Sequence, residues 1–166
     1  MKRFVPAILL LSACAYPEKP APHPSALFFI TTDCPIANSF APEIKRIIAE
    51  YGPRGVEFTM IYTDLTQAPE AARRHAEEYG YKSLVLVDAG RVQSRKHGIT
   101  VTPEAVVLDG NGARVYRGRI DDRYLAPGQY RLQPTTRELR DALDAVLAGR
   151  PVRVAETKAA GCPLTD

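Results

Sequence analysis

The chain has 166 residues, of which 25% are charged and 45% hydrophobic, as is ordinary for a globular domain. This length supports one domain with a substantial core and is too short for two comfortable ones. The formal net charge is +3, and two of these charges come from Lys2 and Arg3, which we expect to be removed with a leader. No basic stripe or acidic tail remains, so the composition argues against a nucleic-acid partner.

The first thirteen residues are typical of a targeting signal. Lys2 and Arg3 form a charged start, and residues 4–13 form an apolar segment too short to span a bilayer. This segment runs into Leu11-Ser12-Ala13-Cys14, which resembles the lipobox of bacterial lipoproteins. The segment is either a lipoprotein signal or an ordinary secretory signal that happens to contain a cysteine. Under both interpretations the mature chain leaves the cytosol.

The lipobox resemblance has three implications. Residues 1–13 would be a signal peptide, and Cys14 would carry lipid that holds the protein at a membrane surface. Because Ala15 follows the cysteine, the resemblance also implies sorting to the outer membrane, facing the periplasm. We therefore expect a lipid-anchored protein of the cell envelope.

Residues 14–25 are predicted to form a tether. Four prolines lie close together there and favour an extended polyproline II chain over helix or strand. They are Pro17, Pro20, Pro22 and Pro24. At roughly 3.1 Å per residue, the ten residues 16–25 that hold these prolines reach about 30 Å. We expect a folded domain over residues 26–150 and a C-terminal tail over 151–166.

Strands and helices alternate through the expected domain. The apolar residues 27–31 predict a buried strand, and the apolar positions of residues 36–51 share one helical face. We expect further strands over 56–62, 84–87, 104–108 and 114–116, and further helices over 69–79, 91–97 and 135–147. The order β-α-β-α-β-α-β-β-α predicts an α/β fold with a mixed central sheet and helices on both faces.

Two local signals refine the C-terminal half. Asp109-Gly110-Asn111-Gly112 is a strong turn signal that joins the last two strands as a hairpin. Thr135 or Thr136 is expected to cap the last helix. The polar connection over 119–134 is long, which is typical of a functional or mobile loop.

Cys34 is the main candidate for chemistry. It follows the first apolar strand and precedes Pro35, which suits the first position of a helix. Free backbone N–H groups and the helix dipole at such a position favour an anion, and the thiolate is the reactive form of cysteine. The alternative is a buried, inert core thiol, which is a common fate of free cysteine.

The order of elements, with a cysteine at the first strand–helix junction, resembles the thioredoxin fold. It resembles more closely the redoxin and peroxiredoxin-like (AhpC/TSA-related) branch over residues 26–150. The match is carried by three segments: Thr31-Thr32-Asp33-Cys34-Pro35-Ile36-Ala37-Asn38, Ala41-Pro42-Glu43 and Val101-Thr102-Pro103-Glu104. The resemblance implies that Pro103 is a cis-proline packed beside Cys34, where it would shape a substrate groove.

The chain also departs from these families. Ala37 stands where a thioredoxin has its second cysteine, so dithiol exchange within one helical turn is impossible. Thr31 and Cys34 keep the Thr-x-x-Cys spacing of peroxiredoxins, but Leu27 stands where their proline belongs. Peroxidases of this type use an arginine to hold the thiolate, and we expect Arg119, or alternatively Arg117, to take that role.

A second thiol is available in the C-terminal tail. If Cys14 carries lipid, Cys34 and Cys162 remain, and an even pair in an oxidising compartment can form a disulfide. Cys162 lies in Gly161-Cys162-Pro163, on a polar tail without helical or strand periodicity. We expect it to be the thiol that resolves an intermediate on Cys34, with a permanent disulfide or a spare thiol as alternatives.

The sequence therefore predicts a thiol–disulfide oxidoreductase with Cys34 as nucleophile and Cys162 as resolving thiol, assisted by Thr31, Pro103 and Arg119. Its expected partners are protein or small-molecule disulfides or peroxides, together with a thiol reductant, and no cofactor is expected. One alternative is a peroxiredoxin-like thiol peroxidase. Another is a non-catalytic copper-binding or assembly module, although no histidine has a Cys or His partner at metal-ligand spacing and no metal site is expected.

Overall fold

The structure is a computed structural model and describes residues 23–64 and 68–164. The expected signal peptide, the lipidation residue Cys14 and most of the proline-rich tether lie outside the described residues. Within the described ranges, no helix combines the length and the apolar character that crossing a membrane requires.

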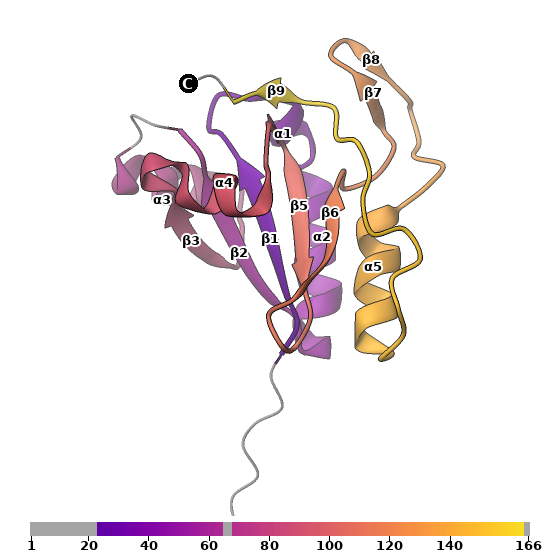
Figure 1. The fold of residues 1–166 in the computed structure, drawn as a ribbon. Coiled ribbons are helices and arrows are strands. Elements are labelled where there is room, and N and C mark those ends of the chain that lie inside the picture. The colour runs from indigo at the N-terminus through magenta and orange to yellow at the C-terminus, as the bar shows by residue number, and fades with distance from the viewer. Residues whose placement is uncertain (1–22, 65–67, 165–166) are drawn as a thin grey trace, which may run out of the picture.

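A mixed five-stranded sheet forms the centre of the fold (Figure 1). Its strands are β1 (Ser25–Ile30), β2 (Glu57–Tyr62), β3 (Leu84–Val87), β5 (Glu104–Leu108) and β6 (Arg114–Gly118). They are hydrogen-bonded in the order β3-β2-β1-β5-β6. The first three strands are parallel, whereas β5 is antiparallel to β1 and forms the predicted hairpin with β6.

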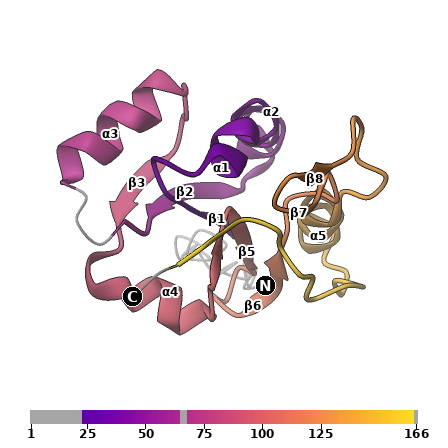
Figure 2. The ribbon, with the colours of Figure 1, turned by 90° about the horizontal axis from the view of Figure 1, so that it is seen from above.

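Helices cover both faces of this sheet. They are α1 (Pro35–Ser39), α2 (Ala41–Tyr51), α3 (Pro69–Glu78), α4 (Val92–His97) and α5 (Glu138–Leu147), with short 3-10 turns η1 (Gly52–Arg54) and η2 (Ala89–Arg91). Figure 2 shows α4 on the opposite side of the sheet from α1 and α2. The predicted α/β fold with a mixed central sheet is confirmed.

The alternation of side chains along β1 divides the core between the two faces. Phe28 belongs to a large buried cluster with Ile44 of α2 and Leu143 of α5. Phe29 belongs to a smaller cluster on the other face, where the ring of His97 in α4 lies 6.0 Å from the Phe29 ring. Because β1 is buried on both sides, the strand that leads to Cys34 is held firmly in the core.

One predicted helix is in fact two. The sequence predicted a single helix over 36–51, but Phe40 separates α1 from α2. Pro42 lies in the first turn of α2 and has no N–H to donate to the carbonyl of Asn38, so an unbroken helix would lose a hydrogen bond there. A proline in the first turn of a new helix has no such cost.

The connection over 119–134 contains a short hairpin that was not predicted. β7 (Tyr124–Ala126) and β8 (Gln129–Tyr130) pair antiparallel in a sheet of their own. The ring of Tyr124 lies 5.4 Å from the ring of Phe40, so the base of this hairpin packs beside the junction of α1 and α2.

The predicted cap of the last helix is wrong. α5 begins at Glu138, and its N-cap is Arg137, which makes no side-chain cap bond. The backbone N–H groups of Thr135 and Thr136 are instead bound by the carboxylate of Asp122, at 2.6 and 3.0 Å. The two threonines therefore belong to the end of the loop, which a buried acid ties down.

We expect Asp122→Ala to lower the free energy of unfolding by about 2 kcal/mol at neutral pH, because two backbone donors lose a charged acceptor. Burial alone would raise the pKa of Asp122, but the hydrogen bonds from Thr135 and Thr136 outweigh it and lower the pKa to about 2. A lowered carboxyl pKa stabilises the fold above the ordinary value near 4, and this contribution is lost as the pH falls toward 2. Urea unfolding of wild type and Asp122→Ala should therefore show a difference in unfolding free energy that shrinks between pH 5 and pH 2. A difference that stays constant over this range would contradict this account.

Two further short strands also lie outside the main sheet. β4 (Val101–Thr102) pairs antiparallel with β9 (Cys162–Pro163). The tail shows no helical or strand period in the sequence, and β9 was not predicted. A two-residue strand is too short to show a side-chain period, so only its backbone bonds to a distant segment reveal it.

Candidate active site

Cys34 lies where the sequence predicted, between β1 and α1. It is the N-cap residue of α1, with Pro35 as the first residue of the helix. The backbone N–H of Ala37 donates to its sulfur at 3.4 Å. An N–H in this position can also donate to a sulfur that carries negative charge, which is the state needed for attack on a disulfide.

The cis-proline loop lies directly against this thiol. The Thr102–Pro103 peptide bond is cis, as the resemblance implies. The Cys34 thiol donates to the carbonyl of Thr102 at 3.2 Å. The hydroxyl groups of Thr31 and Thr102 lie 3.4 Å apart. Three predicted site residues, Thr31, Cys34 and Pro103, are thus brought together around Thr102, which the sequence analysis did not single out.

Cys162 reaches the same place from the far end of the chain. Its partner in the β4–β9 pairing is Thr102, the residue whose carbonyl accepts from Cys34. Both thiols are free in this structure, with Cys34 buried and Cys162 half-buried. Burial raises the pKa of the Cys162 thiol, and its contact with Cys34 raises it further. Both cysteines thus lie at Thr102.

Residues 155–164 of the tail, which we call the strap, lead to the site. The strap runs beside β6, where Arg117 N–H donates to Ala155 and Thr157 N–H donates to Arg117, at 2.9 and 3.0 Å. The Tyr116 hydroxyl also lies 2.8 Å from the Thr157 hydroxyl. In Figure 1 the yellow strap passes alongside α5 and then places β9 above the start of α1.

Two glycines allow this close approach. A Cβ atom at Gly118 would lie 2.1 Å from the Thr157 hydroxyl oxygen, and one at Gly161 would lie 2.1 Å from the Thr102 carbonyl oxygen. Both contacts are far shorter than real Cβ contacts, so the strap can lie in this position only with glycine at these places. Gly161, directly before Cys162, is the residue type that permits such a close approach of two backbones.

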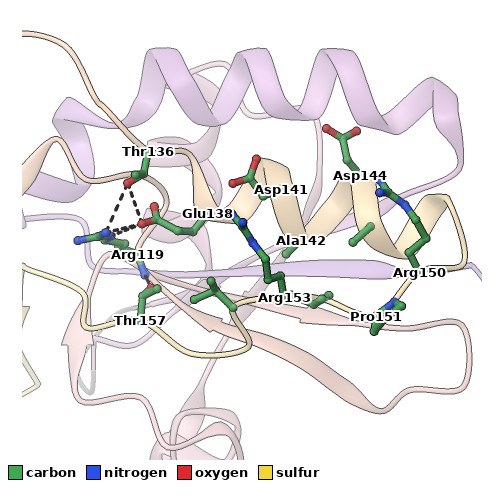
Figure 3. A pocket seen from close by; sticks show the side chains of 13 residues that line it. Arg119, Thr136, Glu138, Asp141, Ala142, Asp144, Arg150, Pro151, Arg153 and Thr157 are labelled. Atoms are coloured by element: carbon green, nitrogen blue, oxygen red, sulfur yellow. Dashed lines mark hydrogen bonds and ion pairs between the residues drawn. The ribbon is translucent and has the colours of Figure 1, made fainter.

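Arg119 has a different set of partners from the one predicted. Its guanidinium pairs with the Glu138 carboxylate, including an Nε–Oε1 contact of 3.0 Å, and reaches the Thr136 hydroxyl at 3.4 Å (Figure 3). These residues line one end of a groove of about 680 Å³ between α5 and residues 150–157. No contact of Arg119 with Cys34 is found in the described part of the chain.

Arg117, the alternative arginine, is also engaged. It forms an ion pair with Glu156 of the strap and lies 3.5 Å from the buried carboxylate of Glu104. Burial raises the pKa of Glu104. Arg117 therefore fastens the strap to the sheet, and its described contacts do not include Cys34.

The copper alternative takes Cys34, Cys162 and His97 as its ligands. Among residues 23–64 and 68–164, no group of three His, Cys, Asp or Glu side chains is arranged to hold a metal ion. The ring of His97, in α4, lies 6.0 Å from the ring of Phe29.

Solved structures of other proteins share this fold. An uncharacterized conserved protein from Geobacillus kaustophilus is 30% identical, with a TM-score of 0.77, and the match covers 87% of this chain and 78% of that chain. A hypothetical protein from Sinorhizobium meliloti 1021 is 25% identical, with a TM-score of 0.75, over 86% of this chain and 79% of that chain.

A third similar structure carries a functional description. It is a secreted Mycobacterium tuberculosis disulfide oxidoreductase homologous to Escherichia coli DsbE, 22% identical over 76% of this chain and 81% of that chain, with a TM-score of 0.51. At this identity the likeness concerns the fold. A scan against protein-family models finds no match. A search of curated proteins also finds none.

The likeness to the Geobacillus protein extends over most of both chains and reaches the identity at which common descent is plain. Thioredoxin-like structures share the arrangement of sheet and helices. The chain therefore has the thioredoxin-like fold and belongs to one family with the uncharacterized conserved protein from Geobacillus kaustophilus.

Proposed function

We propose that the protein is a thiol–disulfide oxidoreductase in which Cys34 is the nucleophile and Cys162 the resolving thiol. One observation carries this proposal: two free cysteines far apart in the sequence meet at Thr102, one through a thiol hydrogen bond and the other through strand pairing. A chance surface cysteine would have no reason to be delivered there by a strap that needs glycine at two positions.

The reaction is a pair of exchange steps. The Cys34 thiolate attacks one sulfur of a partner's disulfide, forms a mixed disulfide and expels the other partner sulfur as a thiolate. Cys162 then loses its proton to solvent and attacks the Cys34 sulfur, which releases the second partner thiolate and leaves a Cys34–Cys162 disulfide. The partner gains two electrons and the protein loses two. A thiol reductant restores the pair by the reverse exchange.

The division of roles follows from the surroundings of the two thiols. The raised pKa of Cys162 makes it a poor first nucleophile, whereas Cys34 receives a backbone N–H at a helix start. The side chain of Cys34 is only 1% exposed, so an external disulfide reaches it only when β9 moves aside. β9 is two residues long, and such a short pairing can open without unfolding the sheet.

We place this activity in the cell envelope, with a lipid anchor on Cys14 and the outer membrane as the site of attachment. The targeting signal in the sequence supports this location, and one structure of the same fold is described as secreted. An oxidising compartment also provides disulfides as substrates. Protein or small-molecule disulfides are the proposed partners.

The test is thiol mapping by mass spectrometry in glutathione buffers poised from about −320 to about −120 mV. We expect Cys34 and Cys162 to convert together from two thiols to one disulfide within this range. A pair that stays oxidised throughout would be a structural staple, and one that never bonds would refute the proposal. Hydrogen peroxide in place of oxidised glutathione tests the peroxiredoxin-like alternative, which requires rapid stoichiometric oxidation of Cys34.

A further inference from the structure

The turn that leads to Cys34 is held at both backbone groups of one residue, Thr32. Its N–H donates at 3.1 Å to the carboxylate of Asp64, which lies two residues after the end of β2. Its carbonyl accepts from the side-chain amide of Asn38, in α1, at 3.0 Å. Cys34 follows only two residues later, so these two bonds fix the backbone from which its side chain projects.

His75, in α3, holds Asn38 in place. The side-chain amide nitrogen of Asn38 donates to Thr32, so the amide oxygen Oδ1 is the atom that lies 3.1 Å from Nε2 of His75. Because an amide oxygen can only accept, Nε2 of His75 must carry the proton. The other ring nitrogen, Nδ1, then accepts from the Tyr62 hydroxyl at 2.9 Å. The imidazole is 7% exposed and stacks on Tyr79, with ring centroids 4.4 Å apart.

We propose that Asn38, His75 and Asp64 are positioning residues for Cys34, which together hold the Thr32 backbone so that the Cys34 sulfur faces Thr102 and Cys162. This inference rests on the proposed function. Asn38 comes from α1, His75 from α3 and Asp64 from the loop after β2. Asn38 and Asp64 bind Thr32 directly, and His75 acts through Asn38. Misplacement of a reacting atom by about 1 Å can cost on the order of 100-fold in rate.

The chain offers matched variants that separate positioning from general stability. His75→Phe and Asn38→Leu fill similar space but remove the donors, whereas His75→Gln keeps an N–H that can donate to Asn38. His97→Phe is the control, since His97 is also a buried histidine but lies in α4 on the opposite face of the sheet.

The readout is the effective concentration of the Cys34–Cys162 pair, measured from its equilibrium with glutathione. We expect the effective concentration to fall about tenfold in His75→Phe and in Asn38→Leu, because a tenfold change corresponds to the loss of roughly one hydrogen bond. His75→Gln should stay within about twofold of wild type, and so should His97→Phe. A merely structural role would move stability alone, and circular dichroism with urea unfolding records that separately.

The outcomes separate this inference from the proposed function. Suppose that the disulfide forms in wild type and that its effective concentration is the same in Asn38→Leu and His75→Phe. The positioning role is then wrong, and the oxidoreductase proposal stands. An equal loss in His97→Phe would also overturn the positioning role. If the wild type forms no disulfide in any buffer, the proposed function itself fails.

Discussion

Replacing Cys162 with serine is expected to stop the reaction at the mixed disulfide. The variant keeps the Cys34 nucleophile but has no thiol to expel the partner, so oxidised glutathione should leave one glutathione bound per chain at Cys34. Release by free glutathione should be at least about 100-fold slower than the intramolecular step, because a held neighbouring thiol acts at a very high effective concentration. Acid quenching followed by peptide mass mapping measures both species.

Cys34→Ser is the matched control for this experiment. It keeps the half-buried Cys162, whose pKa is raised by burial and which should therefore accumulate a glutathione adduct only slowly. If the Cys34→Ser protein forms its adduct as fast as the Cys162→Ser protein, the roles of nucleophile and resolving thiol are reversed. If neither variant forms an adduct, neither thiol is active.

Gly161→Val is expected to lift β9 from the site. Its Cβ atom would fall 2.1 Å from the Thr102 carbonyl oxygen, and a backbone atom of the cis-proline loop cannot yield as a flexible side chain would. Overpacking of this kind costs about 1–3 kcal/mol, which corresponds to a roughly five- to 140-fold rise in the open population. Cys34, now 1% exposed, should be alkylated faster by that factor, while formation of the disulfide with Cys162 should fall.

The control is Gly52→Ala. Gly52 has an ordinary helical backbone conformation, and a Cβ atom there meets nothing within 4 Å. Cys34 in the Gly52→Ala protein should be alkylated at the wild-type rate. If Gly161→Val also reacts at the wild-type rate, the strap does not control access to Cys34.

The local pattern of the sequence was enough to predict most of the sheet and helices. The buried strand before Cys34 and the β5–β6 hairpin follow from side-chain period and turn chemistry, which act within a few residues. The break at Phe40 was readable in principle, since Pro42 stands there in the sequence. The start of α5 was not readable, because Thr135 and Thr136 belong to a loop whose N–H groups are bound by Asp122, from an earlier part of the chain.

The candidate site divides in the same way. Cys34, Pro35 and the cis-proline at Pro103 could be placed from residue types and order along the chain, with the resemblance to a known fold. The partners of Arg119 could not be placed, because an arginine side chain is long and pairs with whichever carboxylate the fold brings near. In this fold that carboxylate is Glu138.

Residue types and their order along the chain were enough to predict the thioredoxin-like succession of strands and helices, with one cysteine at the first strand–helix junction. The pairing of Cys162 with Thr102, and the bonds of Asn38 and His75 near the turn before Cys34, become visible only in the folded chain. The period of apolar residues reports which face of a single element is buried. A backbone hydrogen bond between distant segments, or a series of side-chain hydrogen bonds between several elements, leaves no repeating pattern in the sequence.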